Sequence, residues 1–201
     1  MEETIGLISG LIVVLSAIPY VIRIYQRKIT PNLVSWSIWT FLGLAILLTY
    51  RSSGAGDNIW PAVFGFTNPL MVAILAIWRG KRKKPDSIEI TCIVFGLVSI
   101  VLWFFVQNDP SSAQYALFIA IVADLWAAIP TVRFLWKSPM EDRPFAWGLF
   151  AIGYGIAIFA IKEHTFANYI LPLYMSSTAA LLSGFLTVYR IKNKIPLREW
   201  I

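Results

Sequence analysis

The stretch Ile18-Pro19-Tyr20-Val21-Ile22-Arg23 decides the fold, because it returns later in the chain as Ile129-Pro130-Thr131-Val132-Arg133. Trp36 follows the first proline by seventeen residues, and Trp147 follows the second proline at the same spacing. Similarity within one chain at a fixed spacing is typical of an internal repeat. The chain is therefore predicted to contain two copies of one unit.

A shift of 111 residues aligns 17–79 with 128–190 without a gap. Apolar sequences match by chance, so the number of identities alone does not support a repeat. The prolines, the tryptophans and the terminal arginines do support it, because these residues have geometric roles. The aligned pairs include Pro19/Pro130, Trp36/Trp147, Pro61/Pro172, Thr67/Thr178 and Arg79/Arg190.

The composition is typical of an integral membrane protein with several spans. Hydrophobic residues make up 58% of the chain and charged residues 14%. A helix needs about 18 or more apolar residues to cross a hydrocarbon core of about 30 Å, and the chain contains seven such runs. They fill the chain and leave no room for a soluble domain. The predicted helices are 4–25, 33–51, 58–79, 87–106, 114–136, 145–162 and 166–190.

The basic residues predict the orientation. Fifteen of the seventeen Lys and Arg residues fall in alternate loops and in the C-terminal tail, whereas Arg51 and Lys162 lie on the other side. The positive-inside rule then places the N-terminus outside and the C-terminus in the cytoplasm. The run Lys81 to Lys84 is interpreted as a topology anchor, with binding of anionic lipid headgroups as the alternative.

The repeat also predicts the arrangement of the helices. A three-helix unit ends on the side opposite its start, so a second unit in the same orientation needs one extra crossing. We therefore expect a 3+1+3 plan, with a first unit at 1–84, a linker helix at 85–110, and a second unit with a basic tail at 111–201. Parallel repeats of this kind are a transporter architecture, with the solute site near the midplane.

These features resemble the PQ-loop superfamily, which includes the SWEET sugar transporters, the half-size semiSWEETs, and lysosomal cystine and cationic amino-acid transporters. The family dipeptide Pro-Gln is represented here by Pro19-Tyr20 and Pro130-Thr131. The resemblance implies alternating-access transport of a sugar or an amino acid. It does not extend to the sugar-contacting asparagines of SWEETs, because Ala62 and Leu173 follow the corresponding prolines.

Asp124 is the sharpest candidate for the solute or proton pathway. It lies within the predicted fifth helix, about ten residues from either membrane boundary, where an ionised side chain costs several kcal/mol unless it faces a cavity or a partner. We hypothesise that reversible protonation of Asp124 couples transport to protons, as the resemblance to the cystine-transporter branch implies. The alternative is a structural acid that is hydrogen-bonded to neighbours such as Asn68 or Tyr154.

Two further polar clusters are predicted near the midplane, Thr67-Asn68-Pro69 and Ser176-Ser177-Thr178. Asn68 offers both a donor and an acceptor to a polar solute. Pro69 frees a backbone carbonyl one turn earlier, which can line a cavity. The alternative is that these small polar residues only hold helices together. Two deep aromatic residues, Trp126 and Tyr154, are predicted to stack on a ligand.

The repeated prolines are candidate hinges for alternating access. Pro19 and Pro130 each remove a backbone hydrogen bond in the cytoplasmic half of a helix, which produces either a moving hinge or a static kink. Pro61 and Pro172 lie near the outer helix ends, where a proline can simply start a helix. Together with Pro69 they are further gate candidates.

Two other functions are compatible with the same scaffold. A ligand-binding receptor or sorting protein is one alternative, because the KDEL receptor resembles this scaffold, and a nicotinamide riboside-type carrier is another. A retinal photoreceptor is not expected, because retinal forms a Schiff base with a lysine of the last helix and 166–189 contains no lysine. An enzyme is not expected either, because the sequence shows no Ser/His pair and Asp124 is the only acid at depth. No cofactor or metal site is predicted, because Cys92 and His164 are single. A monomer suffices for one transport path. The membrane is the plasma (inner) membrane if the protein is prokaryotic.

Overall fold

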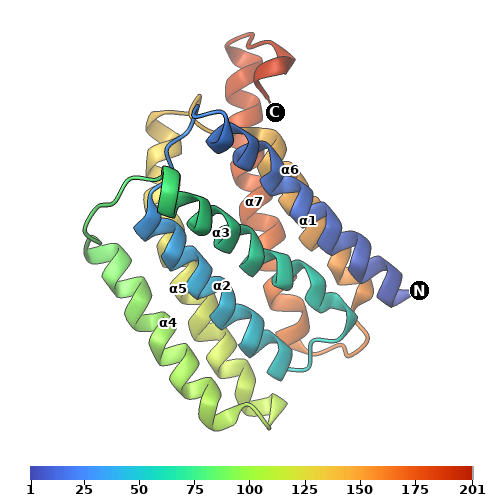
Figure 1. Cartoon of the computed structure of the whole chain (residues 1–201). Coiled ribbons are helices and arrows are strands. Elements are labelled where there is room, and N and C mark those ends of the chain that lie inside the picture. Colours follow the sequence, from blue (N-terminus) through green and yellow to red (C-terminus); the bar gives the residue numbers. More distant parts are fainter. Residues whose placement is uncertain (201) are drawn as a thin grey trace.

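The computed structural model describes residues 1–200, and the regular structure in that range is helical, without a strand (Figure 1). The seven α-helices pack side by side, and the last one extends beyond the others at the C-terminal end. The elements are α1 (Glu2–Tyr25), α2 (Leu33–Ser52), η1 (Asp57–Ile59), α3 (Trp60–Arg79), α4 (Ser87–Val106), α5 (Pro110–Lys137), α6 (Pro144–Ala157), η2 (Ile158–Ala160), α7 (Phe166–Lys192) and η3 (Leu197–Glu199).

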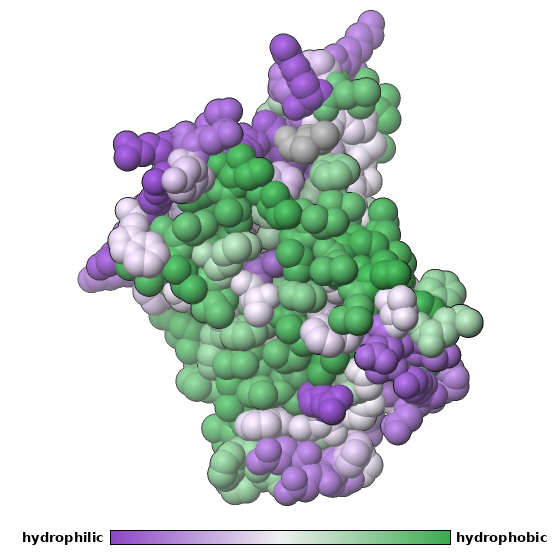
Figure 2. All heavy atoms as spheres, turned by 45° about the vertical axis from the view of Figure 1, so that its right-hand side comes forward, coloured by the Kyte–Doolittle hydropathy of each residue, from purple (hydrophilic) through white to green (hydrophobic). Residues whose placement is uncertain are grey.

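Six of these helices are long and apolar enough to cross a membrane. Figure 2 shows the matching surface, a broad hydrophobic belt with hydrophilic residues gathered at its two ends. The sixth helix differs from its prediction over 145–162, because α6 ends at Ala157 after 14 residues and continues only as one 3₁₀ turn. An α-helix of that length spans about 21 Å, which is less than the roughly 30 Å of a hydrocarbon core.

Side-chain caps fix the starts of several helices. Asp86 and Glu89 form a reciprocal capping box at the start of α4, with two hydrogen bonds of 2.9 Å. Asp109 accepts a hydrogen bond from the Ser111 amide, so α5 starts at Pro110, where a proline is well tolerated. The helix predicted over 114–136 therefore starts four residues earlier, because Asp109 is its cap and Pro110 its first residue.

Each helix packs against two or three others. In the following, α1 to α3 are called the first unit and α5 to α7 the second unit. The two units meet where α1 packs on α6 and where α2 packs on α5, and α4 packs outside α2 and α5 (Figure 1). The α1–α6 contact depends on Gly153, because an added Cβ there would lie 2.9 Å from the Ser9 carbonyl oxygen.

The main hydrophobic core lies toward one end of the bundle. We call the end that carries most Lys and Arg residues the basic end, and the opposite end, with the connectors 53–56 and 161–165, the far end. The core residues occupy the halves of their helices that are nearer the far end. They are Val13, Ala45, Ile46, Tyr50, Ala55, Ala62, Leu117, Ala120, Tyr154, Ala167, Leu171 and Met175.

Arginines close each unit at the basic end. Arg79 donates to the Tyr25 carbonyl oxygen at 2.6 Å, with its guanidinium 4.7 Å from the centre of the Tyr25 ring. Arg190, 111 residues later, is fully buried and donates to the carbonyl oxygens of Pro139 and Asp142. Arg79 thus links α3 to the end of α1 in the first unit. Arg190, at the equivalent position of the second unit, links α7 to the loop after α5.

Candidate functional site

Asp124 lies near the middle of α5 with only 7% of its surface exposed. The Tyr174 hydroxyl of α7 donates a hydrogen bond of 2.8 Å to its Oδ2. Within residues 1–200 no other hydrogen bond reaches the carboxyl group, and no cationic group pairs with it. Asn68 and Tyr154, which the structural alternative named as possible neighbours, are not hydrogen-bonded to Asp124, and Tyr174 is a site residue that the sequence prediction missed.

Asn68 connects the first and third helices of the first unit. It is buried in α3, and its Nδ2 donates to the Val13 carbonyl oxygen of α1 at 2.9 Å. Position 13 corresponds to position 124 under the 111-residue shift. Each unit thus contains one polar bond between its first and third helices at the same level, and only the bond in the second unit contains an ionisable carboxyl group.

The predicted aromatic ligand contacts lie in different surroundings. Tyr154 is 2% exposed, and its hydroxyl donates to the Pro61 carbonyl oxygen at 3.0 Å, which ties α6 to α3. Its ring also packs against Phe150, with 4.8 Å between the ring centres. Trp126 lies on the outer surface of α5 with 44% exposed. The two side chains are therefore not gathered around one space.

The hydroxyl groups of the second cluster are also bound elsewhere. Ser176 donates to the Ala151 carbonyl oxygen of α6 at 2.9 Å, and Thr178 donates back to its own helix at Tyr174. Ser177 is exposed, and Thr67 is half-buried in α3. Of these four side chains only Ser176 links two helices within the described residues, and none of the four is hydrogen-bonded to Asp124.

The contact between α1 and α3, which we call the α1–α3 seam, is tight because α1 carries glycines there. A Cβ added at Gly10 would lie 2.8 Å from the Trp60 Cβ and 2.9 Å from the Phe64 ring. Real side chains do not approach this closely, so only glycine allows the two helices to lie at this distance. The α1–α3 seam is therefore a continuous packed surface.

The corresponding contact in the second unit, the α5–α7 seam, is sparse. The positions equivalent to Gly6 and Gly10 are Leu117 and Ile121, whose side chains do not allow the same close approach. Long side chains bridge the two helices instead. From the far end to the basic end, the bridges are Phe118–Phe166 at 5.7 Å between ring centres, Asp124–Tyr174, and the parallel stack Trp136–Phe185 at 5.1 Å.

A polar network joins the two units at the far end. The Tyr50 hydroxyl donates to the Asn168 carbonyl oxygen at 2.9 Å and accepts from Asn58. Pro172 explains why this carbonyl is available, because a proline has no N–H to donate to the residue four positions earlier. Pro172 lies inside α7, so its role here is to free a carbonyl oxygen rather than to start the helix.

The connectors add an ion pair and further hydrogen bonds to this network. Lys162 Nζ lies 2.7 Å from Asp57 Oδ2, and the hydrogen bond with Asp57 raises the pKa of Lys162. Asn168 Nδ2 donates to the carbonyl oxygens of Glu163 at 2.8 Å and Gly54 at 3.3 Å. The far end is thus closed by contacts between the two units. Sequence reasoning missed the contacts between the units because each of them joins residues that are more than 100 positions apart in the chain.

The other predicted prolines lie at two kinds of position. Pro61 is in the first turn of α3, where it starts the helix. Pro69 lies inside α3, Pro19 inside α1 and Pro130 inside α5, and all three helices continue past them.

The basic run at the start of α4 is partly used within the protein. Lys83 Nζ lies 3.6 Å from Asp86 and 3.4 Å from Glu89. Glu89 in turn accepts a hydrogen bond of 2.6 Å from Ser35 of α2. Lys83 therefore helps to dock α4 on α2, whereas the side chains of Lys81, Arg82 and Lys84 are exposed.

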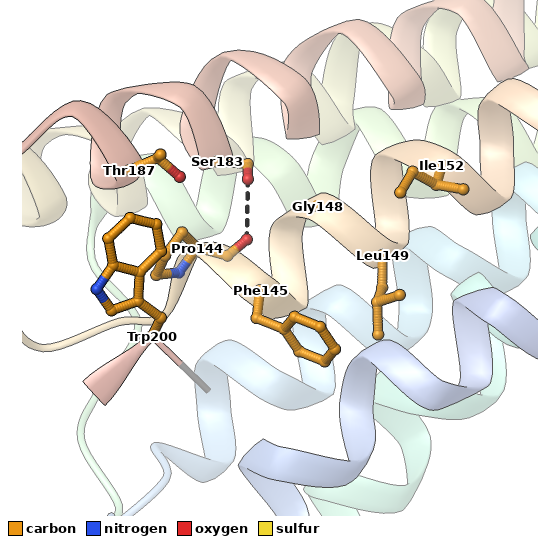
Figure 3. A pocket seen from close by; sticks show the side chains of 8 residues that line it. All are labelled: Pro144, Phe145, Gly148, Leu149, Ile152, Ser183, Thr187 and Trp200. Atoms are coloured by element: carbon orange, nitrogen blue, oxygen red, sulfur yellow. Dashed lines mark hydrogen bonds between the residues drawn. The ribbon is translucent and has the colours of Figure 1, made fainter. Parts of the chain in front are cut away.

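Two hollows lie on the surface, and neither is lined by Asp124. One lies between α6, α7 and the C-terminal tail, with a volume of about 250 Å³ (Figure 3). The other lies along the outer face of α4 and is apolar. Residues 1–200 contain no group of three or more His, Cys, Asp or Glu side chains that could hold a metal ion. No protein-family model, curated protein or solved structure matches the chain.

Proposed function

We propose that the protein is a membrane carrier for a small polar solute that works by alternating access, on a PQ-loop-like 3+1+3 plan. The observation that carries this proposal is Asp124, a buried carboxyl group near the middle of a spanning helix without a cationic partner within residues 1–200. Ionisable side chains at this depth are costly and usually belong to a solute or proton pathway. The solute is a sugar or an amino acid.

The orientation proposed from the sequence places the basic end in the cytoplasm and the far end outside. Under this orientation the Tyr50–Asn168 contact and the Asp57–Lys162 ion pair close the outer side of the path. The core is also concentrated in the outer half. The described conformation then corresponds to a carrier that is closed to the outside, with Asp124 at the inner limit of the closed half.

The two seams suggest which helices move. The α1–α3 seam is packed through glycines, so the first unit moves as one body. The α5–α7 seam is held by three side-chain bridges, so a small displacement of α7 can break the Tyr174–Asp124 bond and expose the carboxyl group. Pro130 lies in α5 between the bridge at Asp124 and the bridge at Trp136, at a position suited to a hinge.

We further propose that Asp124 couples the solute to protons. Tyr174 holds the carboxyl group when the seam is closed, and proton exchange occurs when the seam opens. A neutral carboxylic acid crosses the apolar interior at a smaller cost than a carboxylate. A receptor on the same scaffold would bind its ligand without flux, so transport itself separates the two functions.

The proposal is tested by uptake into proteoliposomes, with a panel of sugars, amino acids and nucleosides, with and without a pH gradient. Asp124→Asn keeps the size of the side chain but cannot exchange a proton, so we expect the gradient-driven part of uptake to disappear. The matched control is Asp109→Asn, because asparagine caps a helix as well as aspartate does. Unchanged flux and pH dependence in Asp124→Asn would exclude the coupling. Ligand binding without flux for every compound would favour a receptor.

A further inference from the structure

The hollow between α6 and α7 is an open groove at the basic end (Figure 3). Gly148 leaves its floor without a side chain, and Phe145, Leu149 and Ile152 make one wall apolar. The helices stay joined beneath it, because Ser183 donates to the Pro144 carbonyl oxygen at 2.9 Å. The groove has a volume of about 250 Å³ and is lined mainly by apolar atoms. It is therefore shaped for an apolar chain rather than for a polar solute.

The C-terminal tail forms the outer end of this groove. Trp200 lies beside Pro144 in Figure 3, and its carbonyl oxygen accepts a hydrogen bond from the Phe145 amide at 3.3 Å. The Trp200 indole donates to the Ile195 carbonyl oxygen at 3.1 Å, which holds the ring in place. The tail is thus folded back onto the start of α6.

The groove is polarised along the bundle axis. Its inner end at Ile152 is apolar, whereas Thr187 and Trp200 lie toward the outer end. Arg143, which precedes Pro144 in the chain, has a buried Nε without a hydrogen-bond partner within residues 1–200. Unpaired buried donors are rare in proteins and indicate a missing acceptor.

Charge at the outer end favours an anion. The basic residues of this corner are Arg143 before α6, Arg190 and Lys192 in the last turn of α7, and Lys194 and Arg198 in the tail. The acidic residues of the same corner are Glu141, Asp142 and Glu199. Five basic residues against three acidic ones leave this corner with a net positive charge. Basic groups that flank a membrane helix at the cytoplasmic surface attract anionic lipids.

We propose that the α6–α7 groove binds one anionic phospholipid, with an acyl chain over Gly148 and the phosphate held by the basic tail. The short α6 makes this site possible, because it starts well below the end of α7 and leaves a step at the membrane surface. A phospholipid fits the step with its chain toward the midplane and its headgroup at Lys194 and Arg198. This proposal does not depend on transport.

The experiment uses the full chain purified in detergent, with phosphatidylglycerol or phosphatidylcholine of identical acyl chains added back. Thermal unfolding and native mass spectrometry measure stabilisation and bound lipid. We expect phosphatidylglycerol to raise the unfolding temperature more than phosphatidylcholine does. Lys194→Gln with Arg198→Gln should weaken phosphatidylglycerol binding about 30-fold, because each basic residue contributes roughly a fivefold change.

The matched control is Arg27→Gln with Lys28→Gln, which removes the same charge from exposed positions between α1 and α2 at the same end. This variant should keep the binding of the unchanged protein. A second variant, Trp200→Ala, removes the apolar outer end of the groove without changing charge and should reduce the stabilisation by both lipids. An equal loss in both charge variants would mean diffuse attraction to the surface and would overturn the site. Equal stabilisation by both lipids would overturn the preference for an anion.

Discussion

The Tyr174 hydroxyl donates to Asp124 across the α5–α7 seam, at the level where Asn68 donates to the Val13 carbonyl oxygen across the α1–α3 seam. Both bonds join the first and third helices of a unit. In the first unit the acceptor is a backbone oxygen, which cannot be protonated under physiological conditions. In the second unit the acceptor is a carboxyl group, so only this bond can respond to a proton or to a solute.

Tyr174→Phe removes the only hydrogen bond to the Asp124 carboxyl group within residues 1–200. We expect a loss of about 1–3 kcal/mol in the free energy of unfolding, because a buried polar group remains without its partner. The pH profile of uptake should shift as well, because Tyr174 no longer holds the carboxyl group. The control is Tyr169→Phe, which removes a hydroxyl group that contacts His164 at the exposed far end. An unchanged pH profile in Tyr174→Phe would mean that the bond is structural only.

Gly10→Ala tests the tight seam of the first unit. Its Cβ would lie 2.8 Å from Trp60, so we expect α1 to move away from α3 and the free energy of unfolding to fall by about 1–3 kcal/mol. The control is Gly184→Ala in α7, where an added Cβ meets nothing within 4 Å. That variant should be stabilised by roughly 0.5–1 kcal/mol, because alanine is the better helix former. Chemical denaturation in mixed micelles measures the free energy of unfolding of both variants. An unchanged free energy of unfolding in Gly10→Ala would contradict a rigid α1–α3 seam.

Tyr50→Phe tests the closure of the far end. The change leaves the Asn168 carbonyl and the Asn58 amide buried without their shared partner, at a cost of about 1–3 kcal/mol. We expect a cysteine introduced by Ala55→Cys, in a background of Cys92→Ala, to react faster with a thiol reagent added from outside. Ala55 is a suitable reporter because it is 2% exposed. Tyr115→Phe on the exposed face of α5 should leave the labelling rate unchanged, and an equal increase in both would contradict a specific closure.

The cap of α4 predicts a pH dependence of stability. The Glu89 amide donates to the Asp86 side chain, and this hydrogen bond lowers the pKa of the Asp86 carboxyl group. Because the folded pKa lies below the unfolded value of about 3.9, the cap stabilises the protein above that value. The stabilisation is lost as the pH falls through the folded pKa.

Asp86→Asn separates this titration from all others, because asparagine caps equally well but does not titrate. We expect its unfolding temperature to fall less steeply below pH 4 than that of the unchanged protein. Asp86→Ala should cost about 1 kcal/mol at neutral pH. If the unfolding temperatures of the unchanged protein and of Asp86→Asn fell equally steeply with decreasing pH, the cap would contribute nothing to the acid sensitivity.

The sequence predicts the positions of the helices well where long apolar runs end in charged or turn-forming residues, as at Arg79 and Ser87. The start of α5 also had a readable signal, because Asp109 before Pro110 is a cap followed by a helix-starting proline. The end of α6 had no such signal. Ile161 is apolar and continues the run, but it is buried at the far end and so belongs to the closure rather than to the helix.

The site was predictable only in part, because the sequence identifies the buried acid but not its neighbours. Asp124 stands out as a charge within an apolar run, whereas Tyr174 is one of eight tyrosines and carries no signal of its own. The pairing depends on the spacing of α5 and α7, which Leu117 and Ile121 help to set. A comparison of Gly10 with Ile121 under the 111-residue shift could have indicated that the two seams differ, although it does not reveal which side chains bridge the wider one.

The position equivalent to Asp124 in the first unit is Val13, so residues 1–200 hold one carboxyl group at this depth rather than a pair. A transport cycle coupled through Asp124 therefore moves at most one proton. One charge that crosses a membrane potential of 100 mV supplies about 2.3 kcal/mol. That energy supports a solute concentration ratio of about fifty across the membrane for each 100 mV, and a steeper accumulation would require a second proton-binding group.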